Sequence, residues 1–99
     1  MRQQRLRQKF QPPRLKPVLD FAEIWFQETS QITFHDPLAA TTIFNQDICA
    51  FERGWVEVEL TSQRANGMTY WSPDASGPHE VALEVDPPAF FEHYFSFFD

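Results

Sequence analysis

His35 and Asp36 stand side by side at the start of the short, mostly apolar segment "FHDPLAATTIF". An aspartate at this position can accept hydrogen bonds from the first amides of a helix, or it can bind a hard cation such as Ca²⁺. A histidine side chain can donate a proton to a leaving group. Because adjacent residues at a helix start point in different directions, we expect no hydrogen-bonded dyad. The local pattern favours a helix cap beside a satisfied histidine, and the alternative is a cation ligand beside a proton donor.

The rest of the chain offers no second cluster of this kind. Ca²⁺ binds about six to eight oxygens, and the other aspartates stand singly: Asp20, Asp47, Asp74, Asp86 and Asp99. If Asp36 binds calcium, the remaining ligands must come from elsewhere. The three histidines, His35, His79 and His93, lack zinc-ligand spacing, and the one cysteine, Cys49, lies in an apolar stretch typical of a buried, inert thiol. There is also no GxSxG motif, no glycine-rich phosphate loop and no carboxylate pair suited to an ordinary glycosidase.

The basic residues are concentrated near the N-terminus. The chain has 99 residues and a net charge of −6, yet residues 1–19 hold six basic side chains and no acid, so residues 20–99 carry −12. We expect residues 1–14 to be a basic leader, a solvated tail or a frayed helix, because the prolines of "QPPRLKP" interrupt any helix begun there. No aromatic residues interleave with the cations, so we do not expect this leader to bind nucleic acid.

The composition indicates one folded domain. Apolar residues make up 42% of the chain and aromatic residues 16%, which argues against disorder. The basic start is not followed by the apolar stretch of about 7 to 15 residues that a secretory signal needs. No apolar run reaches the roughly 18 residues that span a bilayer. We therefore expect a cytoplasmic protein without a membrane partner.

The pattern of apolar residues predicts three helices and three strands. Residues 17–29 form an amphipathic helix with a broad apolar face, and a second helix follows Asp36, with Pro37 at its first position and Asn45 as a left-handed C-cap. Residues 54–62 and 68–71 alternate around the Asn66–Gly67 turn as an antiparallel pair. A third strand covers residues 79–86, with Val81, Leu83 and Val85 on one face. A final aromatic helix begins at the paired prolines of residues 87–88. The fold class is α+β on these grounds.

Two of these helices are more apolar than so small a domain can easily cover. The helix after Asp36 has no charged face, so it should be buried: its apolar residues are Leu38, Ala39, Ala40, Ile43 and Phe44. The last helix gathers six aromatic residues within about 160° of arc on a helical wheel: Phe90, Phe91, Tyr94, Phe95, Phe97 and Phe98.

Taken together, these segments resemble a known family. The block "FHDPLAATTIFNQDICAFERGWVEVELTS", followed by "GMTYW" and "HEVALEVDPPAFFEHYF", is similar to the C-terminal third of the inosine-uridine preferring nucleoside hydrolases. The resemblance covers residues 17–98. It includes the HDPLA block, the VEVEL strand, the GMT turn and the closing strand and aromatic helix, in the order that the family has them. It implies the C-terminal portion of the α/β nucleoside hydrolase fold, with residues 15–99 forming this segment.

The resemblance implies a calcium-dependent ribonucleoside N-ribohydrolase, which hydrolyses the N-glycosidic bond of purine and pyrimidine nucleosides. By resemblance, Asp36 is a calcium ligand that also contacts the ribose hydroxyls, and His35 is the acid that protonates the leaving base. Trp25 or Phe26, on the helix before this pair, could line the base pocket, or either could simply pack in the helix core. A metal-activated water and a protonated base would both lower the barrier of an oxocarbenium-like transition state.

The chain also lacks two parts of the family's active site. The DTDxGxDD cluster that supplies most calcium ligands in the family has no counterpart here, and neither does the middle segment that contacts the ribose. We therefore expect the chain to be inactive alone and to hold Ca²⁺ weakly, and it would bind a ribonucleoside only if another chain completed the site. The alternative is an interaction or oligomerisation module derived from that fold. In either case we expect self-association or a partner that covers the exposed apolar surface.

Overall fold

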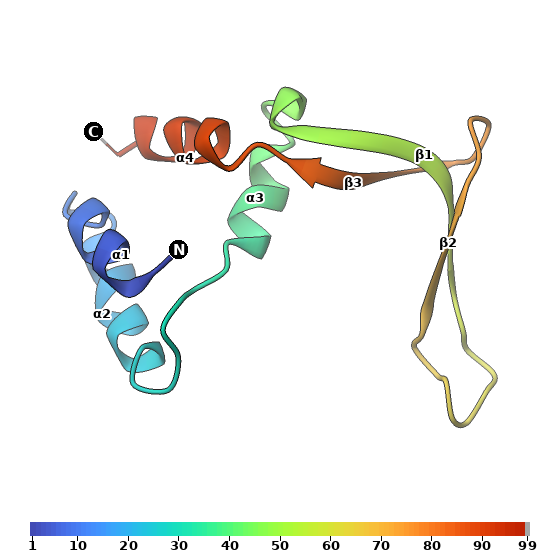
Figure 1. Cartoon of the computed structure of the whole chain (residues 1–99), viewed down its shortest axis with the longest axis horizontal. Helices are drawn as coiled ribbons and strands as arrows, with labels where there is room; N and C mark the ends of the chain where they lie inside the picture. The colour runs from blue at the N-terminus through green and yellow to red at the C-terminus, as the bar shows by residue number, and fades with distance from the viewer. Residues whose placement is uncertain (99) are drawn as a thin grey trace. The chain divides into compact units, whose positions relative to one another are not determined.

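The computed structural model describes residues 1–98 and confirms a mixed α and β chain (Figure 1). Its elements, in chain order, are α1 (Gln3–Lys9), α2 (Lys16–Trp25), α3 (His35–Thr41), the 3-10 turn η1 (Gln46–Ile48), β1 (Cys49–Val58), β2 (Thr69–Pro73), β3 (His79–Val85) and α4 (Pro87–Ser96). They form two compact units. We call Gln46–Asp86 the sheet unit, and Met1–Asn45 together with the segment from Pro87 onward the helical unit.

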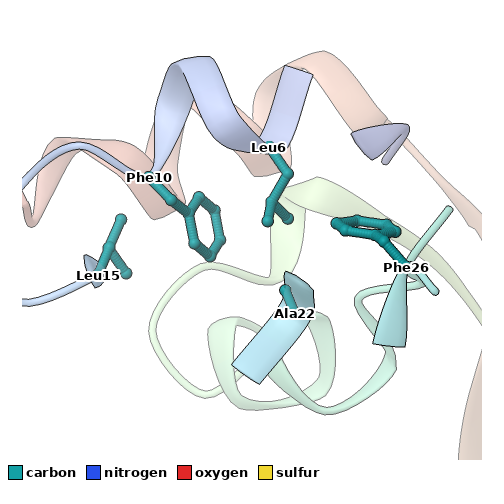
Figure 2. Close-up of a cluster of buried hydrophobic side chains, with 5 residues drawn as sticks. All are labelled: Leu6, Phe10, Leu15, Ala22 and Phe26. Atoms are coloured by element: carbon teal, nitrogen blue, oxygen red, sulfur yellow. The ribbon is translucent and has the colours of Figure 1, made fainter. Parts of the chain in front are cut away.

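The core of the helical unit includes part of the expected leader. Leu6 and Phe10 are 0% and 2% exposed and pack with Leu15, Ala22 and Phe26 (Figure 2). The two leader residues are four positions apart, so they share one face of α1 and can bury it against α2. The expectation of a solvated tail is therefore wrong for this part of the chain, and residues 1–14 belong to the helical unit.

Helix α2 is shorter than predicted, and its apolar face is divided. The helix ends at Trp25, and the amides of Gln27 and Glu28 then bond to carbonyl oxygens three residues back, in a turn. Ala22 and Phe26 face the core, but Phe21 on the outer side of the helix is 74% exposed. The apolar face that the sequence predicts for this helix is therefore only partly buried.

Helix α3 begins two residues earlier than predicted, at His35 and not at Pro37. His35 is its first residue and Phe34 occupies the N-cap position, without a side-chain cap hydrogen bond, so the expectation that Asp36 caps the helix is wrong. Asp36 instead lies in the first turn, where a carboxylate is favoured by the helix dipole. The left-handed C-cap at Asn45 is also wrong, because no described residue other than glycine has a positive φ.

The expected burial of α3 is wrong as well. Ile43 and Phe44, which follow its last turn, are 77% and 78% exposed, and among its own residues only Thr41 is buried. The thiol of Cys49 is likewise only half-buried, not enclosed as expected.

The three predicted strands form an antiparallel sheet in the order β2-β1-β3. The first of them, predicted over residues 54–62, begins earlier, at Cys49, and ends at Val58. β2 pairs with the second half of β1, with Val56 opposite Trp71, and β3 pairs with the first half. Only Gly54 pairs with both neighbours. The connection between β1 and β2 turns at Gly67, whose φ is 87°, in agreement with the predicted Asn66–Gly67 turn. A register shift between Ala50 and Phe51 skips Leu83, so the predicted single face of the third strand is interrupted.

Helix α4 begins where predicted but ends at Ser96, so Phe97 and Phe98 follow the helix and are not part of it. It begins at Pro87, and Phe90 is 3% exposed in the helical unit. The ring of Phe34, just before α3, lies edge-on to Phe91 and Tyr94, with centroids 5.3 and 5.7 Å away. These aromatic contacts fasten the start of α3 to α4 and so position the residues that follow Phe34.

Candidate functional site

His35 and Asp36 form the first turn of α3, and both side chains are exposed. Neither makes a side-chain hydrogen bond or ion pair with another residue between 1 and 98. They follow Phe34, whose ring is held by α4, and precede Pro37, which is half-buried. The structure therefore holds the pair on an anchored backbone and leaves both functional groups free for an external ligand.

The residues present do not make a calcium site. Nowhere in the described part of the chain do three or more histidine, cysteine, aspartate or glutamate side chains gather closely enough to hold a metal ion. Asp36 offers one carboxylate, and Ca²⁺ requires about six to eight oxygens. The carboxylate fits the role of a single ligand in a larger site, and residues 1–98 do not by themselves supply the other ligands.

The two candidates for a base pocket have different environments. Phe26 is 8% exposed in the core of the helical unit, so it has the packing role. Trp25 is 55% exposed, and its indole N–H donates to the carbonyl oxygen of Gln31 at 3.1 Å. Within residues 1–98, Trp25 makes no ring contact or hydrogen bond with His35 or Asp36, so the structure does not bring the three together through direct contact.

An apolar groove lies directly beside the pair, and the sequence does not predict it. The groove has a volume of about 390 Å³ and runs between α3 and α4, lined by Pro37, Ala40, Thr41, Phe44, His93, Tyr94, Phe97 and Phe98. Its wall begins at Pro37, the residue after Asp36. The absence of a charged face on the helix after Asp36 was the sequence signal for this surface, but that signal suggested burial and not an open groove.

Polar side chains of the sheet unit form hydrogen bonds and an ion pair within that unit. Arg53 donates to the carbonyl oxygen of Gly77 at 3.0 Å and pairs with Glu80 at 3.1 Å, and His79 Nδ1 accepts the Val56 N–H at 3.0 Å. The Ser76 amide, then the Ser76 hydroxyl and the Trp55 indole, hold the pKa of Asp74 below its ordinary value. Because these groups have partners within the unit, they hold the loop after β2 and are weak candidates for catalysis.

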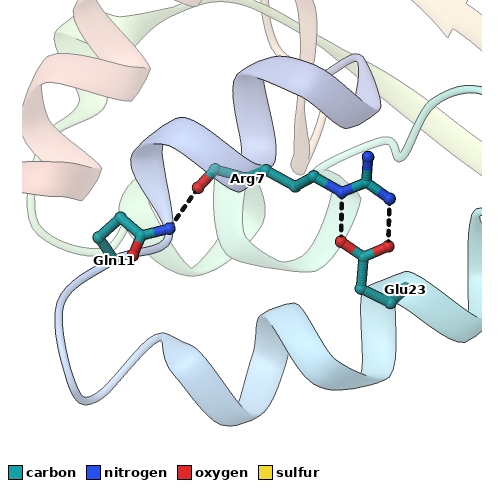
Figure 3. A network of polar contacts seen from close by, with 3 residues as sticks. All are labelled: Arg7, Gln11 and Glu23. Atoms are coloured by element: carbon teal, nitrogen blue, oxygen red, sulfur yellow. Dashed lines mark hydrogen bonds and ion pairs between the residues drawn. The ribbon is translucent and has the colours of Figure 1, made fainter.

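The cations of the leader also contact their own chain. Arg7 forms two hydrogen bonds with the carboxylate of Glu23, at 2.5 and 2.6 Å (Figure 3). Arg5 lies over the ring of Phe91 at 5.1 Å and Lys9 over Phe95 at 5.9 Å. These contacts fasten α1 to α2 and α4.

None of the described helices has the length and apolar character needed to cross a bilayer. Searches of known proteins give no assignment either: no family model, no curated protein and no solved structure matches this chain.

Proposed function

We propose that this chain is the C-terminal segment of a calcium-dependent ribonucleoside N-ribohydrolase and contributes His35 and Asp36 to an active site completed by another polypeptide segment. In this proposal Asp36 supplies one oxygen ligand and a contact to the ribose hydroxyls, and His35 donates the proton to the departing base. The aspartate cluster that provides the remaining calcium ligands is outside these 99 residues. The chain alone is therefore expected to be inactive.

The observation that carries the proposal is the state of the first turn of α3. His35 and Asp36 are exposed without side-chain partners among residues 1–98, at the edge of an apolar groove that the chain leaves open. A buried capping aspartate or a histidine satisfied in the core would argue for a purely structural pair. An exposed polar pair beside an uncovered apolar surface is what a composite site requires, because both features become buried when the missing segment docks.

A complementation assay tests the proposal. The chain is co-expressed with an inosine-uridine preferring nucleoside hydrolase that lacks its own C-terminal third, and ribose release from inosine and uridine is measured in millimolar Ca²⁺. We expect turnover from the mixture and none from either part alone. Asp36→Asn should abolish the restored turnover, and His35→Gln should lower it by about 10²- to 10⁴-fold, the usual contribution of a general acid.

Asp20→Asn is the matched control, because it removes an exposed carboxylate from α2. It should leave the restored turnover unchanged. Calcium-dependent turnover by the isolated chain would contradict the expected inactivity. A folded complex in which His35 and Asp36 variants turn over at the parent rate would contradict the proposed site.

The groove between α3 and α4 favours a second candidate function, a non-catalytic interaction module. Its lining is almost wholly apolar, and Phe44 and Phe97 are 78% and 63% exposed. Such a module would keep its binding partner when Asp36 is replaced by Asn and would lose it when Phe44 is replaced by Ser. The opposite pattern favours the composite hydrolase.

A further inference from the structure

The two outer strands of the sheet unit have very different edges. β2 and β3 both lie at an edge, because β1 is the central strand. The five residues of β2, Thr-Tyr-Trp-Ser-Pro, include no charged side chain, whereas β3 carries Glu80 and Glu84. Charged side chains and bulges are common devices that prevent edge strands from pairing with other chains. β3 has both devices, since its register also shifts at Leu83, and β2 has neither.

The hydrogen bonds at the two ends of β2 establish which of its backbone groups point away from β1. Glu59 N–H donates to the Met68 carbonyl at 2.9 Å, and Asp74 N–H donates to the Arg53 carbonyl at 3.0 Å. Backbone direction alternates along a strand, so the amides of Tyr70 and Ser72 also face β1. The amides of Thr69 and Trp71 and the carbonyl of Pro73 therefore face outward. Pro73 stands where its lack of an N–H costs no hydrogen bond to β1.

This outward edge is complementary to itself. In an antiparallel pair of β2 strands related by a two-fold axis at Trp71, each Trp71 N–H donates to the Trp71 carbonyl of the other copy. Each Thr69 N–H then reaches the Pro73 carbonyl of the other copy. The Thr69 carbonyl, opposite the proline nitrogen, lies at the end of the pair and stays open to water, so the proline does not interrupt this register.

The side chains support the same register. Val56 lies beside Trp71 on one face of the sheet, so the pairing extends an apolar row across four strands, with the two Trp71 residues at its centre. Tyr70 meets Ser72 of the other copy on the opposite face. The equivalent two-fold pairing of β3 about its middle residue, Ala82, would place Glu80 opposite Glu84, and like charges in opposite positions destabilise a sheet.

We propose that two copies of this chain associate through β2, edge to edge and antiparallel about Trp71, and so join their three-stranded sheets into one. The partner is a second copy, because the edge is uncharged and its donors and acceptors match their own two-fold image. The inference concerns the sheet unit alone and does not depend on the proposed hydrolase site.

Analytical ultracentrifugation of the full chain tests the pairing. The parent should be dimeric, and Trp71→Lys and Trp71→Glu should each be monomeric in the concentration range in which the parent is dimeric. An equimolar mixture of the two variants should recover the dimer, because unlike charges then stand opposite each other. Ala82→Lys, at the middle of the β3 edge, is the matched control and should leave the dimer unchanged.

A second variant guards against loss of folding at Trp71. Thr69→Pro removes an outward amide and spares the bonds to β1, as Pro73 already does, so it should weaken the dimer while the far-UV circular dichroism is retained. Hydrogen exchange in the parent dimer should show protected amides at Thr69 and Trp71. A monomeric parent, a dimer that survives Trp71→Lys, or fast exchange at Thr69 and Trp71 in the dimer would each overturn the proposal.

Discussion

The ionisable side chains of this chain fall into two groups. One group has polar partners within the described chain: Arg7, Glu23, Asp74 and His79. Their hydrogen bonds and ion pairs stabilise the fold. Asp36, by contrast, is exposed, and its carboxylate has no hydrogen bond or ion pair to another described side chain. This difference is the reason to place the candidate chemistry at the first turn of α3 and not in the sheet unit.

The ion pair between Arg7 and Glu23 leads to a pH-dependent prediction. The hydrogen bond from Arg7 lowers the pKa of Glu23 from its ordinary 4.5. Its stabilising contribution is therefore present above the ordinary pKa and is lost as the pH falls through the lower pKa of the folded state. Glu23→Gln should lower the urea midpoint at pH 7 by a small, salt-sensitive amount, because both side chains are substantially exposed. Near pH 2 the parent and the variant should converge.

Asp20→Asn is the control for this experiment, since Asp20 lies on the same helix without an ion pair in the described chain. Its midpoint should match that of the parent at both pH values. A Glu23→Gln shift of equal size at both pH values would show that the carboxylate charge is not the stabilising feature.

At the scale of elements, the sheet depends on a close approach of three backbone segments at Gly54. A Cβ atom on Gly54 would lie 2.3 Å from the Ser72 carbonyl oxygen and 2.6 Å from the Trp71 ring, and a Cβ on Gly77 would lie 2.4 Å from the Gly54 backbone. Gly54 is also the residue of β1 that pairs with both β2 and β3. The absence of a side chain here is therefore what lets one strand bind two partners.

Gly54→Ala should destabilise the sheet unit. The backbone oxygen of Ser72 and the indole of Trp71 must move to admit the methyl group, at a cost of about 1–3 kcal/mol, typical of overpacking. The measurement is urea denaturation followed by tryptophan fluorescence, because Trp55 and Trp71 both lie in the sheet. Gly67→Asn is the control: a side chain there meets no close contact, and the strain of its φ of 87° is smaller for asparagine than for most residues. A Gly54→Ala midpoint equal to that of the Gly67→Asn control would contradict this account.

At the scale of the whole molecule, apolar side chains are exposed on both units. They include Phe21, Ile43, Phe44 and Phe97 in the helical unit and Val58, Leu60 and Leu83 in the sheet unit. Monomeric proteins seldom leave this much apolar surface uncovered. The net charge of −6 makes copies of the chain repel one another at neutral pH, and this repulsion opposes their association.

This repulsion predicts a solubility minimum near the isoelectric point of about 4.9. As the net charge approaches zero, electrostatic repulsion no longer opposes apolar contact between copies. Light scattering between pH 4 and pH 8 should therefore peak near pH 5. Replacing Phe21 and Ile43 together with Gln should reduce that peak without lowering the urea midpoint, because neither side chain belongs to the core. Scattering that is flat with pH, or is unaffected by the double variant, would refute the prediction.

The sequence by itself determined the features that arise from nearby residues. Alternation around Gly67 specified the β1–β2 hairpin, and Pro87 with the aromatic run specified α4, because turn geometry and periodicity act over a few positions. The adjacency of His35 and Asp36 was likewise a local feature, but the local pattern favoured a helix cap, and it was the resemblance to a known family that made the pair a candidate site.

Only the tertiary structure decided which surfaces meet. Leu6 and Phe10 look like isolated apolar residues in a basic leader, and they became core because α2 and α4 supply matching faces. The apolar arc of α2 was divided for the same reason, since α1 covers only its inner half. Asp36 and Phe44 are exposed because no described segment covers them. Burial depends on which distant segments arrive, and the amphipathic pattern of a single helix cannot specify them.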